Sequence, residues 1–271
     1  MKDTGLKRDT IDKYYTKPDV VDLCIKNLPF KIKSTDVIIE PSAGNGTFIG
    51  ALQSLSDNTF FYDIEPEHKL VEKQDFLLFK PPNGERIHVI GNPPFGRQSS
   101  LAIKFIKKSC SFASTVSFIL PKSFKKDSLK NKFPTHFHMI LEIDLPKNSF
   151  MVNEINHDVP CVFQVWEKKS HPRLVPEKLT PHGFTFVSKT ENPCVSIRRV
   201  GVYAGKASCI IDDKNIQTHY FLKFDDKSKK YPDIVDKLNE IEYSESFNTV
   251  GPKSISKQEL IFKVNNFVMF Q

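Results

Sequence analysis

The tetrapeptide Asn92–Phe95, in the stretch GNPPF, carries the residue types best suited to chemistry. The side-chain oxygen of Asn92 and the carbonyl oxygen of Pro93 can each accept one N–H of a planar amino group. An aromatic amine held in this way is drawn toward a tetrahedral nitrogen whose lone pair can attack an electrophile. Pro93 and Pro94 restrict φ and keep the acceptors still, and Phe95 offers a face for a flat ring. The purely structural alternative is a strand terminator with Phe95 in the core.

A second group of candidate residues lies in IEPSAGNGTF, residues 39–48. Gly44 and Gly46 let the backbone turn sharply and approach a ligand just before a helix. A dinucleotide fingerprint would need a third glycine where Ile49 stands, so the pattern disfavours a nicotinamide cofactor. Asp63 ends the next strand, where its carboxylate can accept hydrogen bonds from two ribose hydroxyls.

A third short segment, KQDFL, adds two candidates to the same set. Asp75 can accept a hydrogen bond from an adenine amino group while Phe76 lies against the ring. In chain order the pieces are IEPSAGNG, YDIEP, QDFL and GNPPF. This series resembles the motifs of the S-adenosylmethionine-dependent amino methyltransferases that modify adenine at N6.

The resemblance extends to the arrangement of the whole chain. The upstream stretch DKYYTKPDVVDLCI, residues 12–25, is similar to the segment that those enzymes place over the methionine end of the cofactor. With the cofactor region first, the tetrapeptide second and an additional module last, the order is similar to the γ group of DNA adenine methyltransferases. The resemblance covers residues 11–168.

The resemblance implies S-adenosyl-L-methionine as the cofactor and N6 of adenine in DNA as the methyl acceptor. A base inside a duplex cannot reach such a pocket, so it must be flipped out or start from a single strand. The implied catalytic residues are Asn92, Pro93, Pro94 and Phe95. The implied cofactor-binding residues are Tyr15, Thr16, Glu40, Pro41, Ser42, Ala43, Gly44, Gly46, Phe48, Asp63, Ile64, Asp75, Phe76 and Asn92.

Three alternatives use some of the same residues. Adenine in RNA could accept the methyl group, because only contacts to the 2′-OH would distinguish the sugars. A protein glutamine has the same planar NH₂ chemistry. The chain could also be a catalytically silent nucleic-acid-binding subunit of a methyltransferase complex. The intact tetrapeptide, together with Gly44, Gly46 and Asp63, disfavours the silent subunit.

Hydrophobic periodicity alternates between strands and helices in the first part of the chain. Strands are expected at 36–40, 58–64, 86–92, 114–120, 137–145 and 159–167, and helices at 46–55, 99–111 and 122–132. The last two strands have only the loop 147–158 between them. This rhythm predicts an α/β fold with a mostly parallel sheet, covered on both faces, and a terminal antiparallel strand. Together with the resemblance, it implies a Rossmann-like class I methyltransferase fold.

Two domains are expected from the change of composition after Lys168. The resemblance implies that residues 1–170 form an S-adenosylmethionine-binding catalytic domain. Residues 171–271 begin with a proline-rich linker and form a small α+β module, which we expect to take part in target recognition. Strands are expected there at 184–189, 195–203, 207–212 and 218–224, and a helix at 231–243.

The net charge of +7 is concentrated just after the tetrapeptide. Residues 97–132 hold nine basic groups and one acidic group, which leaves an excess of +8. This excess favours a nucleic acid as partner, with a phosphate-binding rim beside the site; a solvated lysine-rich face is the alternative. The expected nucleic-acid contacts are Arg97, Lys122, Lys125, Lys126, Arg198 and Arg199.

Other classes of function find little support. No apolar run approaches the ~18 residues that cross a bilayer, and the charged start of the chain is unlike a secretory signal. Five scattered cysteines without a Cys-x-x-Cys pair predict reduced thiols and an intracellular location, cytoplasmic, nuclear or inside a virus-infected cell. His136 and His138 lack a third ligand, so no metal site is expected. We expect a monomer or weak homodimer, with a subunit of a complex as the alternative.

Overall fold

The computed structural model describes residues 14–82, 86–225, 234–249 and 251–269. The chain divides into two compact units, Met1–Val175 and Pro176–Gln271. The division therefore falls after Val175 rather than after residue 170. No helix among the described residues is long and apolar enough to cross a membrane.

A seven-stranded sheet organises the first unit, in the order β4-β3-β2-β5-β6-β10-β7. The pairs from β4 to β6 are parallel, and β10 is antiparallel to both β6 and β7. The strand of this sheet that comes last in chain order, β10, thus lies between β6 and β7, with β7 at the edge. Its strands are β2 Val37–Glu40, β3 Asn58–Asp63, β4 Glu72–Lys73, β5 Ile87–Gly91, β6 Thr115–Pro121, β7 Phe137–Asp144 and β10 Cys161–Lys168. This topology confirms the Rossmann-like class I methyltransferase fold that the sequence predicts.

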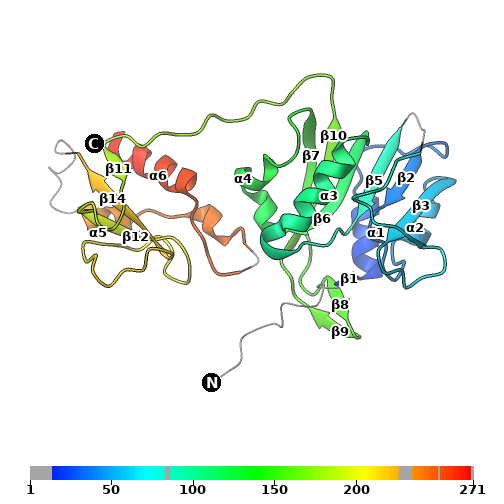
Figure 1. Ribbon diagram of the computed structural model, residues 1–271, viewed down its shortest axis with the longest axis horizontal. Coiled ribbons are helices and arrows are strands. Elements are labelled where there is room, and N and C mark those ends of the chain that lie inside the picture. The colour runs from blue at the N-terminus through cyan, green and yellow to red at the C-terminus, as the bar shows by residue number, and fades with distance from the viewer. Residues whose placement is uncertain (1–13, 83–85, 226–233, 250, 270–271) are drawn as a thin grey trace. The chain divides into compact units, whose positions relative to one another are not determined.

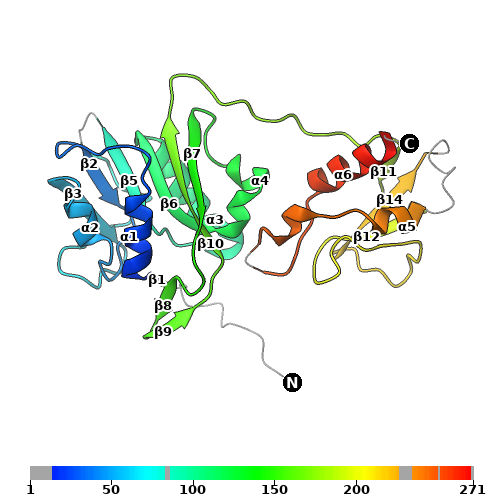
Figure 2. The ribbon, with the colours of Figure 1, turned by 180° about the vertical axis from the view of Figure 1, so that it is seen from behind.

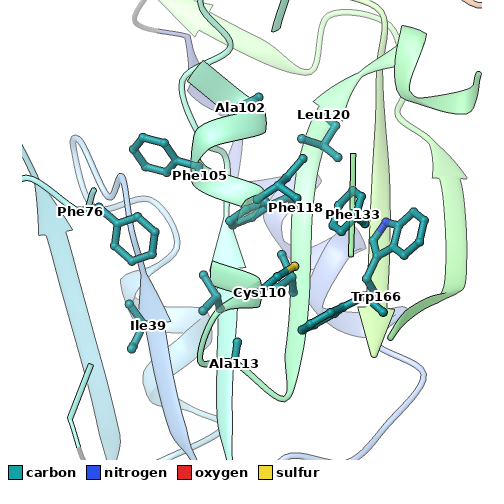
Figure 3. Close-up of a cluster of buried hydrophobic side chains, with 14 of the residues drawn as sticks. Ile39, Phe76, Ala102, Phe105, Cys110, Ala113, Phe118, Leu120, Phe133 and Trp166 are labelled. Atoms are coloured by element: carbon teal, nitrogen blue, oxygen red, sulfur yellow. The ribbon is translucent and has the colours of Figure 1, made fainter. Parts of the chain in front are cut away.

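Helices cover both faces of the sheet because its central strands are apolar on both sides (Figures 1 and 2). Ile38 packs with α1 and α2 on one face, whereas Ile39 faces α3 on the other. Figure 3 shows the α3 face, where Phe105 and Phe118 lie between Phe76 and the indole of Trp166. The helices are α1 Pro18–Lys26, α2 Ile49–Gln53, α3 Ser100–Cys110 and α4 Asp127–Lys130.

Two expected helices are shorter than their sequence patterns predict. The helix expected at 46–55 is only α2, because Gly46 has a φ of +82° and the chain enters the helix through a turn. The helix expected at 122–132 is a 3₁₀ turn, Lys122–Lys125, followed by α4. Lys126 separates them because its backbone is extended, with φ −78° and ψ 138°.

A second, three-stranded sheet forms where the sequence predicts only the loop 147–158. It consists of β1 Tyr15–Thr16, β8 Phe150–Val152 and β9 Ile155–His157, in the order β1-β8-β9. Asn153 and Glu154 connect β8 to β9 with φ values of +48° and +64°, as a two-residue hairpin requires. Figure 1 shows this hairpin beside β1 at one end of the large sheet.

The second unit is the α+β module that the sequence predicts, with an antiparallel sheet in the order β11-β14-β12-β13. Its strands are β11 Phe184–Phe186, β12 Val195–Arg198, β13 Ala207–Ser208 and β14 His219–Phe224. Its helices are α5 Ile234–Asn239 and α6 Lys257–Met269, besides a 3₁₀ turn at Ser244–Phe247. Sequence periodicity did not predict α6, although Leu260 and Val264 of this helix are fully buried. Part of the helix expected at 231–243 lies outside the described residues.

Candidate functional site

A cavity of about 280 Å³ lies at the carboxyl ends of β2, β3 and β5. This is the edge of the sheet where the strand order reverses, between β2 and β5, and where open α/β sheets bind their ligands. Every catalytic and cofactor-binding residue predicted from the sequence lines the cavity, except Gly46. Asn92 and the Gly44 turn therefore face the same space.

The Gly44 turn is joined to the end of β3 by hydrogen bonds. The Gly44 N–H donates to Oδ2 of Asp63 at 2.8 Å, and the Glu65 N–H donates to Oδ1 of the same carboxylate at 2.9 Å. Gly44 has a φ of +49°, and a Cβ there would stand 3.3 Å from the ring of Tyr15. A glycine is thus required both by the backbone and by the approach of β1.

Gly46 does not line the cavity; it is packed inside the turn, against Ile49 and His68. A Cβ at this position would stand 2.7 Å from Ile49 and 2.9 Å from the ring of His68, and its φ is +82°. Its N–H donates to the Ala43 carbonyl at 2.7 Å. The two glycines of the motif therefore have different tasks, since only Gly44 meets the cavity.

Three buried polar atoms around the cavity have no hydrogen-bond partner among the described residues. They are Oγ1 of Thr16, Oε2 of Glu40 and Oδ1 of Asn92. Buried polar groups in folded proteins are nearly always paired, so a cluster of exceptions at one cavity is suited to a polar ligand. Such an arrangement fits a ligand that carries several donors.

Glu40, at the end of β2, lines the cavity. The residue is only 1% exposed. Burial raises its pKa well above the ordinary value, and the negative charge of Asp63 raises it further. Glu40 therefore holds its proton more tightly than an exposed glutamate, and a cation nearby would favour its ionised form.

The Asn92 carboxamide is held in one orientation by its surroundings. Its Nδ2 donates to the Tyr14 carbonyl at 3.1 Å, and its backbone carbonyl accepts a hydrogen bond from Oγ of Ser42 at 3.0 Å. The bond to Tyr14 uses the donor end of the side chain, the bond from Ser42 fixes the backbone, and Oδ1 is left as an acceptor without a partner among the described residues. Asn92 is half-buried and lines the cavity. The interpretation of the tetrapeptide as a strand terminator alone does not account for this position.

Phe95 connects the tetrapeptide to α3. Its carbonyl accepts hydrogen bonds from the N–H groups of Leu101 and Ala102, at 3.1 and 3.2 Å, at the start of the helix. Its ring is half-buried: it packs on core residues and also lines the cavity. Phe95 is thus fixed in place while one part of its ring stays accessible.

Asp75 and Phe76 also line the cavity. Oδ1 of Asp75 accepts the Leu77 N–H at 2.9 Å, which closes a local turn. Phe76 is only 2% exposed and stacks on Phe105 with ring centroids 5.3 Å apart. The Phe76 ring therefore mainly forms part of the cavity wall, and aromatic neighbours pack against it on the core side.

The predicted nucleic-acid contacts lie outside the cavity lining, and Lys122 and Lys125 share one carboxylate partner. Nζ of Lys125 lies 2.8 Å from Asp144, and Nζ of Lys122 lies 3.8 Å from the same residue. Arg97 is exposed just after the tetrapeptide, and Lys126 is half-buried. The excess charge of the strip is thus partly compensated by β7.

Arg198 and Arg199 belong to the second unit. Nε of Arg198 donates to the Val200 carbonyl at 3.0 Å, and the Arg199 guanidinium lies 5.4 Å from the ring centroid of Tyr220. Arg198 thus helps to shape its own loop, whereas Arg199 is exposed.

Several lining residues were not singled out from the sequence: Tyr14, Glu67, Gln74, Leu101 and Phe105. Tyr14 was within reach, since it directly precedes Tyr15 in the expected cofactor segment. Glu67 accepts a hydrogen bond from the Tyr15 hydroxyl at 2.6 Å, a contact that joins positions 52 residues apart. A local sequence pattern cannot predict a partner so far away in the chain.

His136 and His138, for which the sequence offers no third metal ligand, both contact backbone carbonyl oxygens. Nδ1 of His136 lies 3.2 Å from the Lys169 carbonyl oxygen, and Nε2 of His138 lies 2.9 Å from that of His171. Within the described ranges, no group of three or more histidine, cysteine, aspartate or glutamate residues could hold a metal ion.

Comparison with known proteins finds two curated relatives of similar sequence. An rRNA adenine N-6-methyltransferase of Escherichia coli is 25% identical over 193 residues, which span 66% of this chain and 77% of the relative. Another, of Enterococcus faecalis, is 26% identical over the same shares of the two chains. No family model matches the chain.

Two solved structures are similar to part of the chain. The 23S rRNA methyltransferase ErmE is 13% identical with a TM-score of 0.46, over 60% of this chain and 72% of the other. A dimethyladenosine transferase from Plasmodium falciparum is 18% identical with a TM-score of 0.41, over 57% and 62%. These likenesses add nothing to the fold already read from the strand order.

Proposed function

We propose that this chain transfers a methyl group from S-adenosyl-L-methionine to the N6 amino group of adenine in a nucleic acid. The observation that carries the proposal is the Asn92 carboxamide. Its Oδ1 is buried without a partner among the described residues, and it shares a cavity with Gly44 and Asp63. Both curated relatives carry the name of an adenine N-6-methyltransferase, which supports the same acceptor atom.

The residues around the cavity fit the proposed cofactor. The Asp63 carboxylate would accept the ribose hydroxyls, since each of its oxygens has a lone pair besides the one used by a backbone N–H. Glu40 and Thr16 would meet the polar methionine end, where the Glu40 carboxylate would pair with positive charge. The Asp75 carboxylate would accept a hydrogen bond from the amino group of the cofactor's adenine. When bound, the cofactor supplies an electrophilic methyl group on a sulfonium.

Asn92 and Pro93 would activate the acceptor amine. The lone pair of an adenine amino group is delocalised into the ring, so the nitrogen is a poor nucleophile. Oδ1 of Asn92 and the Pro93 carbonyl would each accept one N–H and favour a tetrahedral nitrogen. Because positive charge develops on that nitrogen, the fixed acceptors stabilise the transition state more than the ground state. Pro94 adds rigidity, since its φ is restricted.

Phe95 would hold the plane of the target base. Its ring lines the cavity and is anchored through its backbone on α3. Stacking of a base on an aromatic side chain is worth ~1–3 kcal/mol and tolerates different neighbours in sequence. The base must leave a helical stack to reach the cavity, so a loop, a single strand or a flipped nucleotide is the substrate form.

RNA is the first candidate for the polymer. The observation that favours it is the sequence similarity to two proteins named as rRNA adenine N-6-methyltransferases. DNA is the second candidate, favoured by the order of the motifs and the additional C-terminal module, which resemble the γ group. The preference for DNA drawn from the sequence stays a prediction. The module would contribute Arg198 and Arg199 to the choice of target.

Labelled cofactor decides between these acceptors. The purified protein is incubated with methyl-tritiated S-adenosylmethionine and matched sets of structured RNA, single-stranded DNA, duplex DNA and protein extract, and the labelled polymer is digested to nucleosides. N6-methyladenosine from RNA is the expected product, and N6-methyldeoxyadenosine would select DNA. Label on protein glutamine, or on no acceptor at all, would refute the proposed function.

A further inference from the structure

The orientation of the Asn92 carboxamide depends on the residue before β1, a strand too short to be stable without a partner. The Tyr14 carbonyl accepts a hydrogen bond from Asn92 Nδ2 at 3.1 Å. If the carboxamide turned over, its oxygen would face that carbonyl, and neither atom could donate. The bond therefore selects the orientation in which Oδ1 is left for another donor. Tyr14 immediately precedes β1, which is only two residues long.

The hairpin β8–β9 holds β1 in its register. Tyr15 pairs with Met151 and Thr16 pairs with Phe150 in the antiparallel ladder, and the Lys17 N–H donates to the Ser149 carbonyl at 3.1 Å. An isolated strand of this length has no stability of its own in water. The position of the Tyr14 carbonyl therefore follows from the position of the hairpin.

Two aromatic rings of the hairpin also fix the side chain of Tyr14. The Tyr14 ring meets Phe150 edge-on at 6.3 Å between centroids and His157 edge-on at 5.7 Å. Phe150 is fully buried in the core on the α1 face, so it anchors the hairpin to the domain. His157 pairs with Phe150 across the hairpin and does not line the cavity.

We propose that hairpin β8–β9 is a positioning element for methyl transfer, with His157 as a positioning residue that acts through Tyr14 on the Asn92 carboxamide. The inference rests on the proposed function, because the orientation matters for catalysis only if Asn92 accepts a hydrogen bond from the reacting amine. The proposal gives a function to hairpin β8–β9, which is not part of the seven-stranded sheet. It also explains why a loop between two paired strands carries its own sheet.

The first test compares two substitutions at one position outside the cavity. His157→Ala removes the ring that meets Tyr14, whereas His157→Phe keeps a ring of similar shape. We expect kcat to fall threefold to tenfold in His157→Ala, the equivalent of ~0.6–1.4 kcal/mol, and to recover in His157→Phe. The Kd for S-adenosylhomocysteine should stay within about twofold, because Tyr15 keeps its own anchor on Glu67.

A second readout needs no activity. In the cofactor-free protein, the Asn92 side-chain NH₂ signals are assigned in ¹⁵N-correlated NMR spectra by their loss in Asn92→Ala. The Asn92 Nδ2 proton that donates to the Tyr14 carbonyl should exchange slowly with water in the wild type, faster in His157→Ala and slowly again in His157→Phe. Melting curves check that both variants are folded, as expected for a half-buried residue in a peripheral hairpin.

The outcomes separate the two levels of the argument. Unchanged kcat in His157→Ala, failure of His157→Phe to restore kcat, or unchanged exchange of the Asn92 amide would each overturn the positioning role. A parallel loss of kcat and cofactor affinity would do the same, since it would mean a general loosening of the site. If the wild-type protein methylates no acceptor, the proposed function fails, and the exchange experiment still decides whether the hairpin orients Asn92.

Discussion

Removal of the Asn92 carboxamide separates catalysis from stability. In Asn92→Ala, the fixed acceptor Oδ1 disappears while the Pro93 carbonyl remains. Loss of one preorganised partner of a developing charge costs ~10²–10³ in kcat, or about 2.7–4 kcal/mol. We therefore expect kcat to fall by at least about two orders of magnitude, with little change in cofactor affinity, because the Gly44 turn and Asp63 are untouched.

The same substitution should hardly change the stability of the fold. It removes the hydrogen bond from Nδ2 to the Tyr14 carbonyl at 3.1 Å, whose net value is ~0.5–1.5 kcal/mol. It also removes an oxygen that is buried without a partner among the described residues, whose burial costs ~1–3 kcal/mol. The two effects oppose each other, so the melting temperature should move by no more than a few degrees, about 2–4 °C per kcal/mol.

A matched control is available in the same domain. Asn27 caps the end of α1, where its Nδ2 donates to the Leu23 carbonyl at 2.8 Å, and it does not line the cavity. Asn27→Ala therefore deletes the same group and the same kind of bond elsewhere. It should lower stability by ~0.5–1.5 kcal/mol and leave kcat unchanged.

The assay combines single-turnover methyl transfer, cofactor binding by calorimetry and thermal melting for the wild type and both variants. If Asn92→Ala kept wild-type kcat, or lost cofactor affinity and kcat together, the role assigned to its oxygen would be wrong. An equal loss of kcat in Asn27→Ala would show that any destabilised variant is inactive, which would remove the specificity of the argument.

The remaining predictions address the cofactor, the buried acid and the charged rim. Asp63→Ala should weaken S-adenosylhomocysteine binding by ~10–100-fold in calorimetry, because charge-assisted hydrogen bonds contribute ~1.5–3 kcal/mol; unchanged affinity would remove Asp63 from the site. Burial raises the pKa of Glu40 above its ordinary 4.5, so its contribution to stability is complete below that pH and is lost as pH rises through the folded-state pKa. The Glu40→Gln variant should therefore become more stable relative to the wild type as the pH rises. A difference in melting temperature between the two proteins that is the same at pH 5 and pH 9 would contradict this. Arg97→Gln should reduce the slope of log K against log salt for RNA binding by about 1, and Lys125→Gln by less, because Asp144 already pairs with Lys125; the reverse order would move the rim elsewhere.

The parallel sheet and the place of the candidate cavity could be predicted from the sequence because both follow from local patterns. Val37–Glu40 and Ile87–Gly91 are short apolar runs that end in turn residues, and parallel strands bring their carboxyl ends to one edge. The Gly44 turn and the tetrapeptide therefore had to meet. Gly46 has the same residue type and a neighbouring position, yet its role depends on the distant ring of His68.

The parts that could not be predicted depend on contacts between distant segments. The hairpin β8–β9 is held by the burial of Phe150 in the core and by pairing with β1, in which Thr16 lies opposite Phe150, more than 130 positions later in the chain. The partial neutralisation of Lys122 and Lys125 comes from Asp144 on another strand. Charge counted along the chain cannot reveal such partners, because it ignores which strands are neighbours.

In the proposed reaction, Asn92 Oδ1 accepts a hydrogen bond from the amine that receives the methyl group. The most direct measurement is a crystal structure of the protein with S-adenosylhomocysteine and an adenosine-containing oligonucleotide. We predict that N6 of the target adenine lies ~2.6–3.2 Å from both Asn92 Oδ1 and the Pro93 carbonyl oxygen, with the base stacked on Phe95. An adenine bound elsewhere, or an N6 atom without contact to Asn92 in an active complex, would contradict the account.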